Sequence, residues 1–345
     1  MEVAGVGRGT TATIGLSKPV LTLAGGLTIC LALLAFGAVM IGPYGLTPGQ
    51  TLAALVGRGD RQAQIVVWNI RLPRVAAALL VGAALAAAGA SYQALFRNPL
   101  VSPDILGVSA GAGLGAVAGI FLSLPVAAIQ ASAFVGGMVA VGFVTLVASM
   151  VQNTDRTLTL VLIGVVIGAL AGAATSLLKV MADPYDQLPA ITFWLLGSLA
   201  AITTEDIRPA LPMVLVGLVP LALLRWKINV LSLGDEEARA LGIEVGRTRF
   251  LVIASATLIT ASVTALAGVV GWVGLVIPHI ARMLVGPSFG RLLPVSVLIG
   301  AGYLLIVDTL ARTIAQVEVP LGILTAVIGA PFFVWLLARG RRGWS

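Results

Sequence analysis

Residues 72–95 read LPRVAAALLVGAALAAAGASYQAL, a run of small and apolar side chains with a single charged residue, Arg74. A helix that crosses a bilayer needs about 20 mainly apolar residues, and this run is long enough. The whole chain has the same character, because 59% of its 345 residues are hydrophobic and 10% are charged. Soluble proteins carry roughly 25% charged residues, which they need to cover a water-facing surface. The sequence therefore predicts an all-α integral membrane protein.

Similar apolar runs recur along the chain and predict about ten transmembrane helices in a single domain, residues 1–345. The predicted spans are 19–41, 72–95, 105–122, 126–150, 158–181, 209–225, 248–268, 271–286, 292–314 and 320–338. A shorter run at about 189–201 is too short to cross, and we expect it to lie at the membrane surface or to re-enter. No signal-peptide cleavage site follows the first run, which is therefore interpreted as a span.

The distribution of positive charge predicts the orientation of the chain. With both termini in the cytoplasm, 14 of the 21 Lys and Arg residues fall on the cytoplasmic side and 7 on the outer side, as the positive-inside rule requires. The net charge of +7 is explained by loops that face anionic lipid headgroups, so no nucleic-acid partner is expected. The single cysteine, Cys30, excludes an internal disulfide and a cysteine metal site, and we expect no metal or cofactor on this chain.

The longest predicted cytoplasmic loop covers about residues 226–248 and contains the sequence DEEARALG at 235–242. Acidic residues suit the first turn of a helix, and Gly242 stands where a left-handed residue would end one. We expect two short helices with a sharp turn here. The loop is either a plain connector or a docking segment for a partner protein.

Glycines spaced by four residues occur in two predicted spans, at Gly107, Gly111 and Gly115 and at Gly164, Gly168 and Gly172. This spacing places them on one face of a helix, where two backbones can approach closely. The pattern predicts either ordinary helix packing or the smooth wall of a wide pathway.

Several motifs follow one another in order between about residues 65 and 338. They are RLPR (71–74), LVGAAL (80–85), QALFRNPL (93–100), LGVS (106–109), LGDEEARALG (233–242), GLVIPH (274–279), PLGILTA (320–326) and GAPF (329–332). Together they resemble the iron-chelate and cobalamin (FecCD-type) permease family of bacterial ABC importers. The resemblance implies the ABC type II importer permease fold, in a multi-pass protein of the bacterial inner membrane.

The resemblance also implies partners: a second copy of the chain, two cytoplasmic ATPase subunits, and a periplasmic or lipid-anchored substrate-binding protein. No phosphate-binding loop of the form G-x-x-x-x-G-K-S/T occurs in the sequence, so ATP and Mg²⁺ are expected on the ATPase partner and the chain itself is not expected to be an enzyme. A ferric siderophore is the expected cargo, because it is the commonest in the family. Haem, cobalamin or an oxyanion, and a heterodimer with a paralogue, remain open.

By the same resemblance, Arg71, Arg74 and Arg312 are expected to dock the binding protein on the outer side. Arginine suits this role because its guanidinium pairs with carboxylates through two hydrogen bonds. Snorkelling at a helix end is the alternative. The expected ATPase-coupling residues are Gly234, Asp235, Glu237, Ala238, Leu241 and Gly242, and the expected pathway and gate residues are Thr157, Leu158, Thr159, Gly164, Gly168 and Gly172.

Asp308 and His279 are two further functional candidates. Asp308 lies four residues before Arg312, a spacing that predicts an ion pair which positions the arginine. His279, the only histidine, follows Pro278 and is interpreted as part of a helix kink, because one histidine alone is a poor metal site. A secondary transporter would need coupling carboxylates at the midplane, which Asp308 near a helix end does not provide. An intramembrane enzyme would need a paired nucleophile and base.

Overall fold

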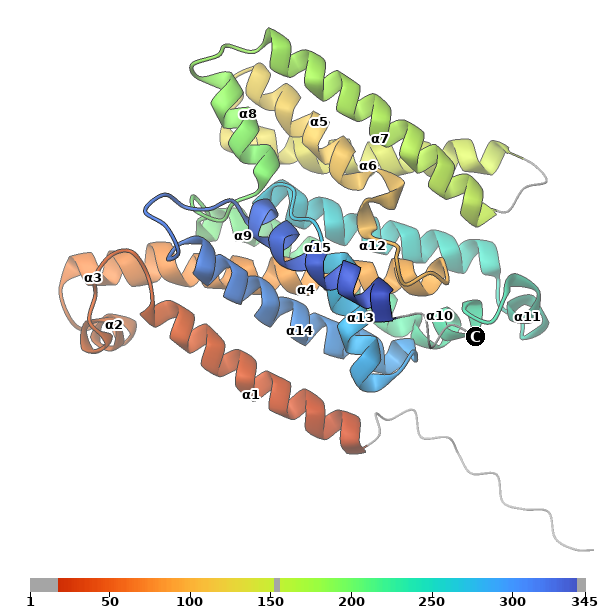
Figure 1. Cartoon of the computed structure of the whole chain (residues 1–345), viewed down its shortest axis with the longest axis horizontal. Coiled ribbons are helices and arrows are strands. Elements are labelled where there is room, and N and C mark those ends of the chain that lie inside the picture. Colours follow the sequence, from red (N-terminus) through yellow and green to blue (C-terminus); the bar gives the residue numbers. More distant parts are fainter. Residues whose placement is uncertain (1–17, 152–155, 340–345) are drawn as a thin grey trace, which may run out of the picture.

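The computed structural model describes residues 18–151 and 156–339, which form helices and loops and, within these ranges, no strand (Figure 1). In order, the helices are α1 (Lys18–Met40), α2 (Pro48–Leu55), α3 (Arg61–Ile65), the π-helix η1 (Val66–Arg71), α4 (Leu72–Leu95), the 3₁₀-helix η2 (Pro103–Leu106), α5 (Val108–Phe121), α6 (Val126–Met150), α7 (Arg156–Met181), α8 (Gln187–Leu196), α9 (Thr204–Leu223), α10 (Arg225–Leu231), α11 (Asp235–Ala240), α12 (Val245–Ala267), α13 (Val273–Val285), α14 (Phe289–Ala311) and α15 (Leu321–Arg339).

The predicted spans match the helices closely. Among the described residues, 7 helical segments are long and apolar enough to cross a membrane. Three shorter apolar helices, α5, α13 and α15, coincide with the remaining predicted spans, and α8 with the run that was predicted not to cross. A capping box begins α2: the backbone N–H of Thr47 donates to Gln50 Oε1 at 2.8 Å, and that of Gln50 to Thr47 Oγ1 at 3.3 Å. The segment before Lys18 lies outside the described residues.

The second span begins earlier than predicted. Helix α3, η1 and α4 form one continuous helical segment, Arg61–Leu95, instead of a helix that starts at residue 72. Pro73 lacks a backbone N–H and cannot complete the regular hydrogen-bond pattern, and the π-helical turn just before it lets the helix continue through this position. Arg71 and Arg74 therefore lie within a helix and not at its start.

Helices α4 and α12 form the centre of the molecule, with 78% of the most apolar window of each buried. Glycines bring α4 against its neighbours: a Cβ at Gly82 would overlap the backbone oxygen of Gly300 on α14, and one at Gly89 that of Gly274 on α13. Such close backbone contact is a common way for helices to associate in a membrane, where lipid tails are as apolar as the side chains. Helices α1 and α7 lie at opposite margins of the structure (Figure 1).

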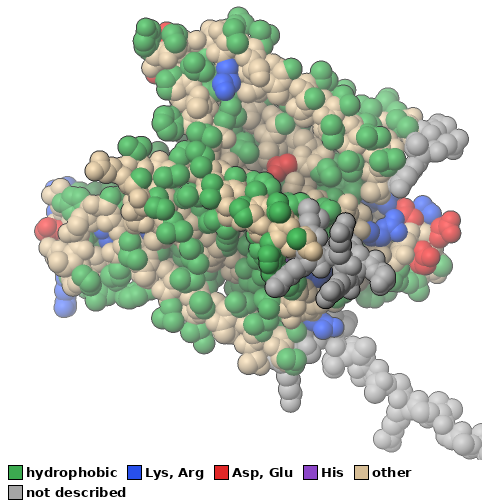
Figure 2. Space-filling view, viewed as in Figure 1, with side chains coloured by type: hydrophobic (Ala, Val, Ile, Leu, Met, Phe, Trp, Pro, Cys, Tyr) green, Lys and Arg blue, Asp and Glu red, His purple; other side chains and the backbone are tan. Residues whose placement is uncertain are grey.

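The two ends of the molecule differ in their elements. Helices α2 and α3 lie at one end, and α10 and α11, in the predicted cytoplasmic loop, lie at the other (Figure 1). Hydrophobic side chains cover much of the surface between them, and charged side chains gather mainly towards the two ends (Figure 2). This distribution is that of a protein whose middle is surrounded by lipid.

Candidate functional site

A buried group of charges joins the ends of α4 and α14 on the side of α2 and α3. Arg74 donates from Nε to Asp308 Oδ1 at 2.9 Å, and its two terminal nitrogens donate to the two oxygens of Glu318 at 2.8 and 2.9 Å. Ser198 Oγ also donates to Glu318, at 3.0 Å. The Asp308 side chain is fully buried and Arg74 is 7% exposed. One arginine thus holds two carboxylates that are 234 and 244 positions away in the sequence.

Arg71 and Arg312 lie beside this pair and bind the end of α1. Arg71 donates to the backbone oxygens of Val39 at 2.8 Å and of Tyr44 at 2.6 Å, and Arg312 Nη2 donates to that of Ala38 at 2.7 Å. The last carbonyls of a helix have no partner within the helix, and they carry partial negative charge that attracts a cation. The two arginines therefore cap α1 and fix it against α4 and α14.

The three predicted docking arginines thus converge, but each uses its guanidinium inside the chain. Arg71 is 3% exposed and Arg312 is 7% exposed, so neither is a snorkelling side chain. The predicted ion pair between Asp308 and Arg312 is present at 3.7 Å, yet Arg74 approaches Asp308 more closely, at 2.8 Å. Docking through these three residues remains a prediction. Glu318 was missed in the sequence, because nothing near it in the chain indicates its partner.

Two exposed arginines occupy the same end of the molecule. Arg58 lies in the turn after α2 and Arg61 is the first residue of α3, where Asp60 caps the helix by accepting from the backbone N–H of Ala63 at 2.7 Å. Among the described residues neither arginine has an ion pair or a side-chain hydrogen bond. Their guanidinium groups are free to meet a partner protein.

The loop at the opposite end has the predicted form. Helices α10 and α11 are separated by a turn at Gly234, and Gly242 adopts a left-handed φ of +78° after α11. Arg249 Nη2 donates to the two oxygens of Asp235 at 2.9 and 3.0 Å, which ties α11 to α12. Ala238 is fully buried whereas Leu241 is 55% exposed. The loop is packed against α12 and also exposes the apolar side chains of Trp226 and Leu233, and its coupling role remains a prediction.

The glycines of α7 fall into two groups. A Cβ at Gly164 would overlap the backbone oxygen of Ile105 in η2, so this glycine serves packing within the chain. Around Gly168 and Gly172, in contrast, an added Cβ would meet no atom within 4 Å. These two glycines lie on an open helix face, as a pathway or an interface between two copies requires. The expected gate residues stand at the start of the same helix, where Thr157 is half-buried, Leu158 is 52% exposed and Thr159 is 8% exposed.

In the other glycine series, Gly107 does not share a helix face with the other two, because it precedes α5 with a left-handed φ of +77°, whereas the packing interpretation holds for Gly111 and Gly115. A Cβ at Gly111 would come within 2.5 Å of the backbone oxygen of Gly136 on α6, and one at Gly115 would overlap that of Ser132. Residues Asn153, Thr154 and Asp155, just before the expected gate, lie outside the described residues.

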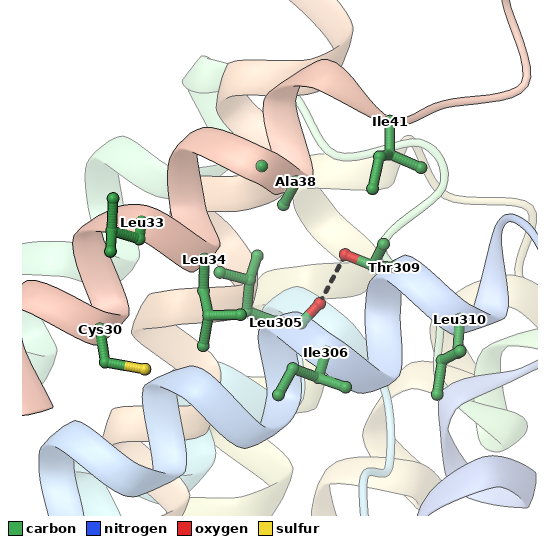
Figure 3. Close-up of a pocket in the computed structure, with 10 residues that line it drawn as sticks. Cys30, Leu33, Leu34, Ala38, Ile41, Leu305, Ile306, Thr309 and Leu310 are labelled. Atoms are coloured by element: carbon green, nitrogen blue, oxygen red, sulfur yellow. Dashed lines mark hydrogen bonds between the residues drawn. The ribbon is translucent and has the colours of Figure 1, made fainter.

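An apolar groove of about 350 Å³ separates α1 from α14 (Figure 3). Cys30, Leu33 and Leu34 line it from α1, and Leu305 and Ile306 from α14. The hydroxyl of Thr309 is satisfied by the backbone oxygen of Leu305 at 2.8 Å. No charged side chain lines the groove, so it is suited to acyl chains and not to a polar cargo.

Comparison with known proteins adds three relatives and one structure. The model of the FecCD transport family matches residues 29–339. The molybdate import system permease protein MolB of Haemophilus influenzae is 40% identical, covering 92% of this chain and 96% of that protein. The cobalamin import system permease protein BtuC of Halobacterium salinarum is 45% identical, covering 80% and 74%. The Fe(3+) dicitrate transport system permease protein FecD of Escherichia coli is 42% identical, covering 80% and 86%.

A solved structure described as an inward-facing conformation of a metal-chelate type ABC transporter has the same fold. It superposes with a TM-score of 0.85 at 38% identity, and the match covers 92% of this chain and 99% of that one.

Proposed function

The chain belongs to the FecCD transport family of ABC importer permeases, and on this basis we propose that it carries a metal chelate, specifically a ferric siderophore, across the inner membrane of a bacterium. The observation that carries the proposal is the match over nearly the whole length of a metal-chelate type transporter, at a TM-score of 0.85. Haem and cobalamin are the alternative cargoes in the same family, and a relative named for molybdate makes an oxyanion a third.

The energy for transport comes from two ATPase subunits that bind at the end of α10 and α11. The Asp235–Arg249 ion pair supports the assignment, because it ties α11 to α12 and so connects this loop to a membrane-spanning helix. Gly234, Asp235, Glu237, Ala238, Leu241 and Gly242 form this coupling element. ATP and Mg²⁺ bind to the partner, and both termini lie on the same, cytoplasmic, side.

Two copies of the chain form the pathway, with α7 of each at the dimer interface. The open face at Gly168 and Gly172 supports this arrangement, as does the small buried share of α7, 22% in its most apolar window. Thr157, Leu158 and Thr159 close the pathway at its cytoplasmic end. A heterodimer with a paralogue would use the same face.

The substrate-binding protein docks at the end that carries α2 and α3. Two sets of arginines have different roles at this end. The buried Arg71, Arg74 and Arg312 fix α1, α4 and α14 against one another, and the exposed Arg58 and Arg61 pair with acidic side chains of the binding protein. Surface pairs of this kind mainly steer the encounter and weaken with salt.

Reconstituted transport tests the proposed function. The chain would be placed in liposomes with the ATPase and the binding protein encoded beside it, and uptake of a ferric siderophore, haem, cobalamin and molybdate would be compared. We expect ATP-dependent uptake of the ferric siderophore that is at least about tenfold faster than that of the others. Faster uptake of cobalamin, haem or molybdate would reject the siderophore and leave the permease assignment intact, whereas uptake without ATPase would reject the importer.

A further inference from the structure

A cavity of about 370 Å³ opens at the end of the molecule that carries α10 and α11. It is bounded by the end of α4 with the loop that follows, by α10, and by the second half of α13. Arg97, His279 and Arg282 contribute cationic or ionisable groups, and Asn229 contributes an amide. None of the residues that line this cavity is Asp or Glu. The cavity is therefore basic without a counter-charge of its own.

Neither guanidinium is neutralised elsewhere. Among the described residues Arg97 and Arg282 form no ion pair, unlike Arg74, Arg249 and the other paired arginines. Arg282 makes a single hydrogen bond, from Nη2 to Gln93 Oε1 at 3.1 Å, and Gln93 is itself fixed by donating from Nε2 to the backbone oxygen of Leu275 at 3.1 Å. The guanidinium of Arg282 is thus oriented by the neutral amide of Gln93, which leaves the positive charge of Arg282 without a counter-charge.

The backbone at Arg97 is held in an unusual conformation. Its φ is +51°, in the left-handed region, directly after the C-cap of α4, and the N–H of Asn98 donates to the oxygen of Gln93 at 3.1 Å to close the helix end. Glycine is the residue that favours this position, because a Cβ is strained there. An arginine at a site that favours glycine suggests that its side chain is used.

The surroundings identify the class of ligand. Two arginines near each other are suited to a phosphate, whose oxygens accept from both guanidinium groups. Next to the cavity, Met283 is 65% exposed and Leu284 is 55% exposed on α13, and Trp226 is 59% exposed on α10. Exposed aliphatic side chains with a tryptophan beside basic residues are typical of the boundary between acyl chains and headgroups.

We propose that this cavity binds the phosphate group of an anionic phospholipid, with the headgroup between Arg97 and Arg282 and the acyl chains over Met283 and Leu284. The placement in the cytoplasmic leaflet rests on the proposed orientation; the binding site itself does not. The lipid would also contact α10, which Asn229 joins to α14 by accepting from the backbone N–H of Phe289 at 2.6 Å. An occupied site therefore stabilises the base of the loop to which the ATPase is proposed to bind.

Lipid binding to the purified full-length chain tests the proposal without any need for transport. Thermal unfolding in a neutral detergent would be followed while dioleoyl-phosphatidylglycerol is added, because a ligand of the folded state raises the unfolding temperature in proportion to its occupancy. Dioleoylglycerol, which has the same acyl chains and no phosphate, and inorganic phosphate are the two comparison probes. We expect the phosphatidylglycerol to raise the unfolding temperature of the wild type and the two comparison probes to have little effect.

The variants isolate the two arginines. Arg97→Gln combined with Arg282→Gln should weaken phosphatidylglycerol binding by about tenfold or more, because charge-assisted hydrogen bonds are lost. Arg291→Gln, which removes an exposed charge near this end but outside the cavity, is the matched control and should bind as the wild type does. Arg97→Gly removes the guanidinium and relieves the backbone, so the lipid-free protein should unfold at the same or a higher temperature while the effect of the lipid becomes smaller.

Each outcome decides between the possibilities. Equal stabilisation of the wild type and the double variant by phosphatidylglycerol would overturn the site. Stabilisation of the wild type by inorganic phosphate alone, lost in the double variant, would retain a phosphate site and overturn the lipid as its occupant. If the site holds but transport of a metal chelate does not, the proposed function fails and this inference stands.

Discussion

At Arg74 one guanidinium is shared by two carboxylates; Arg74 and Asp308 are almost removed from solvent, and the Glu318 side chain is 24% exposed. Burying charges is costly unless they are paired and hydrogen-bonded, and removing one partner leaves the others exposed to that cost. We therefore expect Arg74→Ala to destabilise the protein by about 3–5 kcal/mol. A fall in the unfolding temperature of the purified protein in detergent would measure this effect.

The matched control for this change is Arg58→Ala, at an exposed arginine without an ion pair in the described part of the chain. Surface charges of this kind contribute between about 0 and 1 kcal/mol, so its unfolding temperature should hardly change. An unfolding temperature of Arg74→Ala equal to that of the wild type would mean that the buried group does not stabilise the fold. A loss of transport in Arg74 variants cannot be assigned to docking until this comparison is made.

At the scale of the helices, close backbone contact decides which glycines can change. A Cβ at Gly89 would overlap the backbone of α13, whereas one at Gly142 on α6 would meet nothing within 4 Å. Overpacking typically costs about 1–3 kcal/mol. Gly89→Ala should therefore lower the unfolding temperature, and Gly142→Ala should leave it unchanged or raise it. Equal effects of the two substitutions would show that α4 and α13 can move apart without cost.

The short coupling helix allows a test that separates backbone from side chain. At Gly242 the φ of +78° disfavours most side chains, yet a Cβ would find open space. Gly242→Val should strain the turn by about 1–2 kcal/mol, whereas Gly242→Asn tolerates the left-handed conformation. In the reconstituted transporter we expect the Val variant to hydrolyse ATP with reduced uptake and the Asn variant to remain coupled. Full coupling in the Val variant, with normal assembly, would contradict the role of this turn.

The helices were largely predictable because each apolar run has its own local signal, and the boundaries of α6 at 126 and 150 were predicted to the residue. What the sequence could not reveal are contacts between distant parts of the chain. Asp308 was assigned to Arg312, four residues away, because local spacing favours that pair, whereas its closer partner Arg74 is 234 positions away. The early start of the second span was missed for a related reason, since Arg71 and Arg74 resembled the charged end of a helix until their buried partners were known.

At the scale of the whole molecule, the face of α7 that carries Gly168 and Gly172 is the proposed contact between two copies. Because Cys30 is exposed on α1, the test needs a Cys30→Ser background. We expect Gly168→Cys or Gly172→Cys to form a disulfide-linked dimer in membranes treated with a mild oxidant. The matched control is Gly25→Cys on α1, where a Cβ also meets nothing within 4 Å, and it should remain monomeric. Dimers of the control alone would place α1 at the interface.

The end of the molecule that carries α2 and α3 offers the second test of assembly, because some of its arginines are exposed and others are buried. Arg58 and Arg61 are exposed, so Glu at either position should change the surface charge without disturbing the fold. We expect Arg61→Glu to reduce delivery by the binding protein by about tenfold at low salt, with a smaller effect at high salt, because screening weakens such pairs. Uptake at two salt concentrations, with ATPase activity in the absence of binding protein as the reference, measures this.

Arg71→Glu distinguishes a structural role of the buried arginines from direct contact with the binding protein. Its guanidinium is 3% exposed and binds the end of α1, so a carboxylate there would face backbone oxygens that repel it. If Arg71 acts through structure, Arg71→Glu should lower the unfolding temperature, and its loss of uptake should not depend on salt. An acid-to-Arg change on the binding protein should then restore uptake to Arg61→Glu and not to Arg71→Glu. Rescue of Arg71→Glu by the same acid-to-Arg change would instead show that Arg71 contacts the binding protein directly, after this end of the molecule has opened.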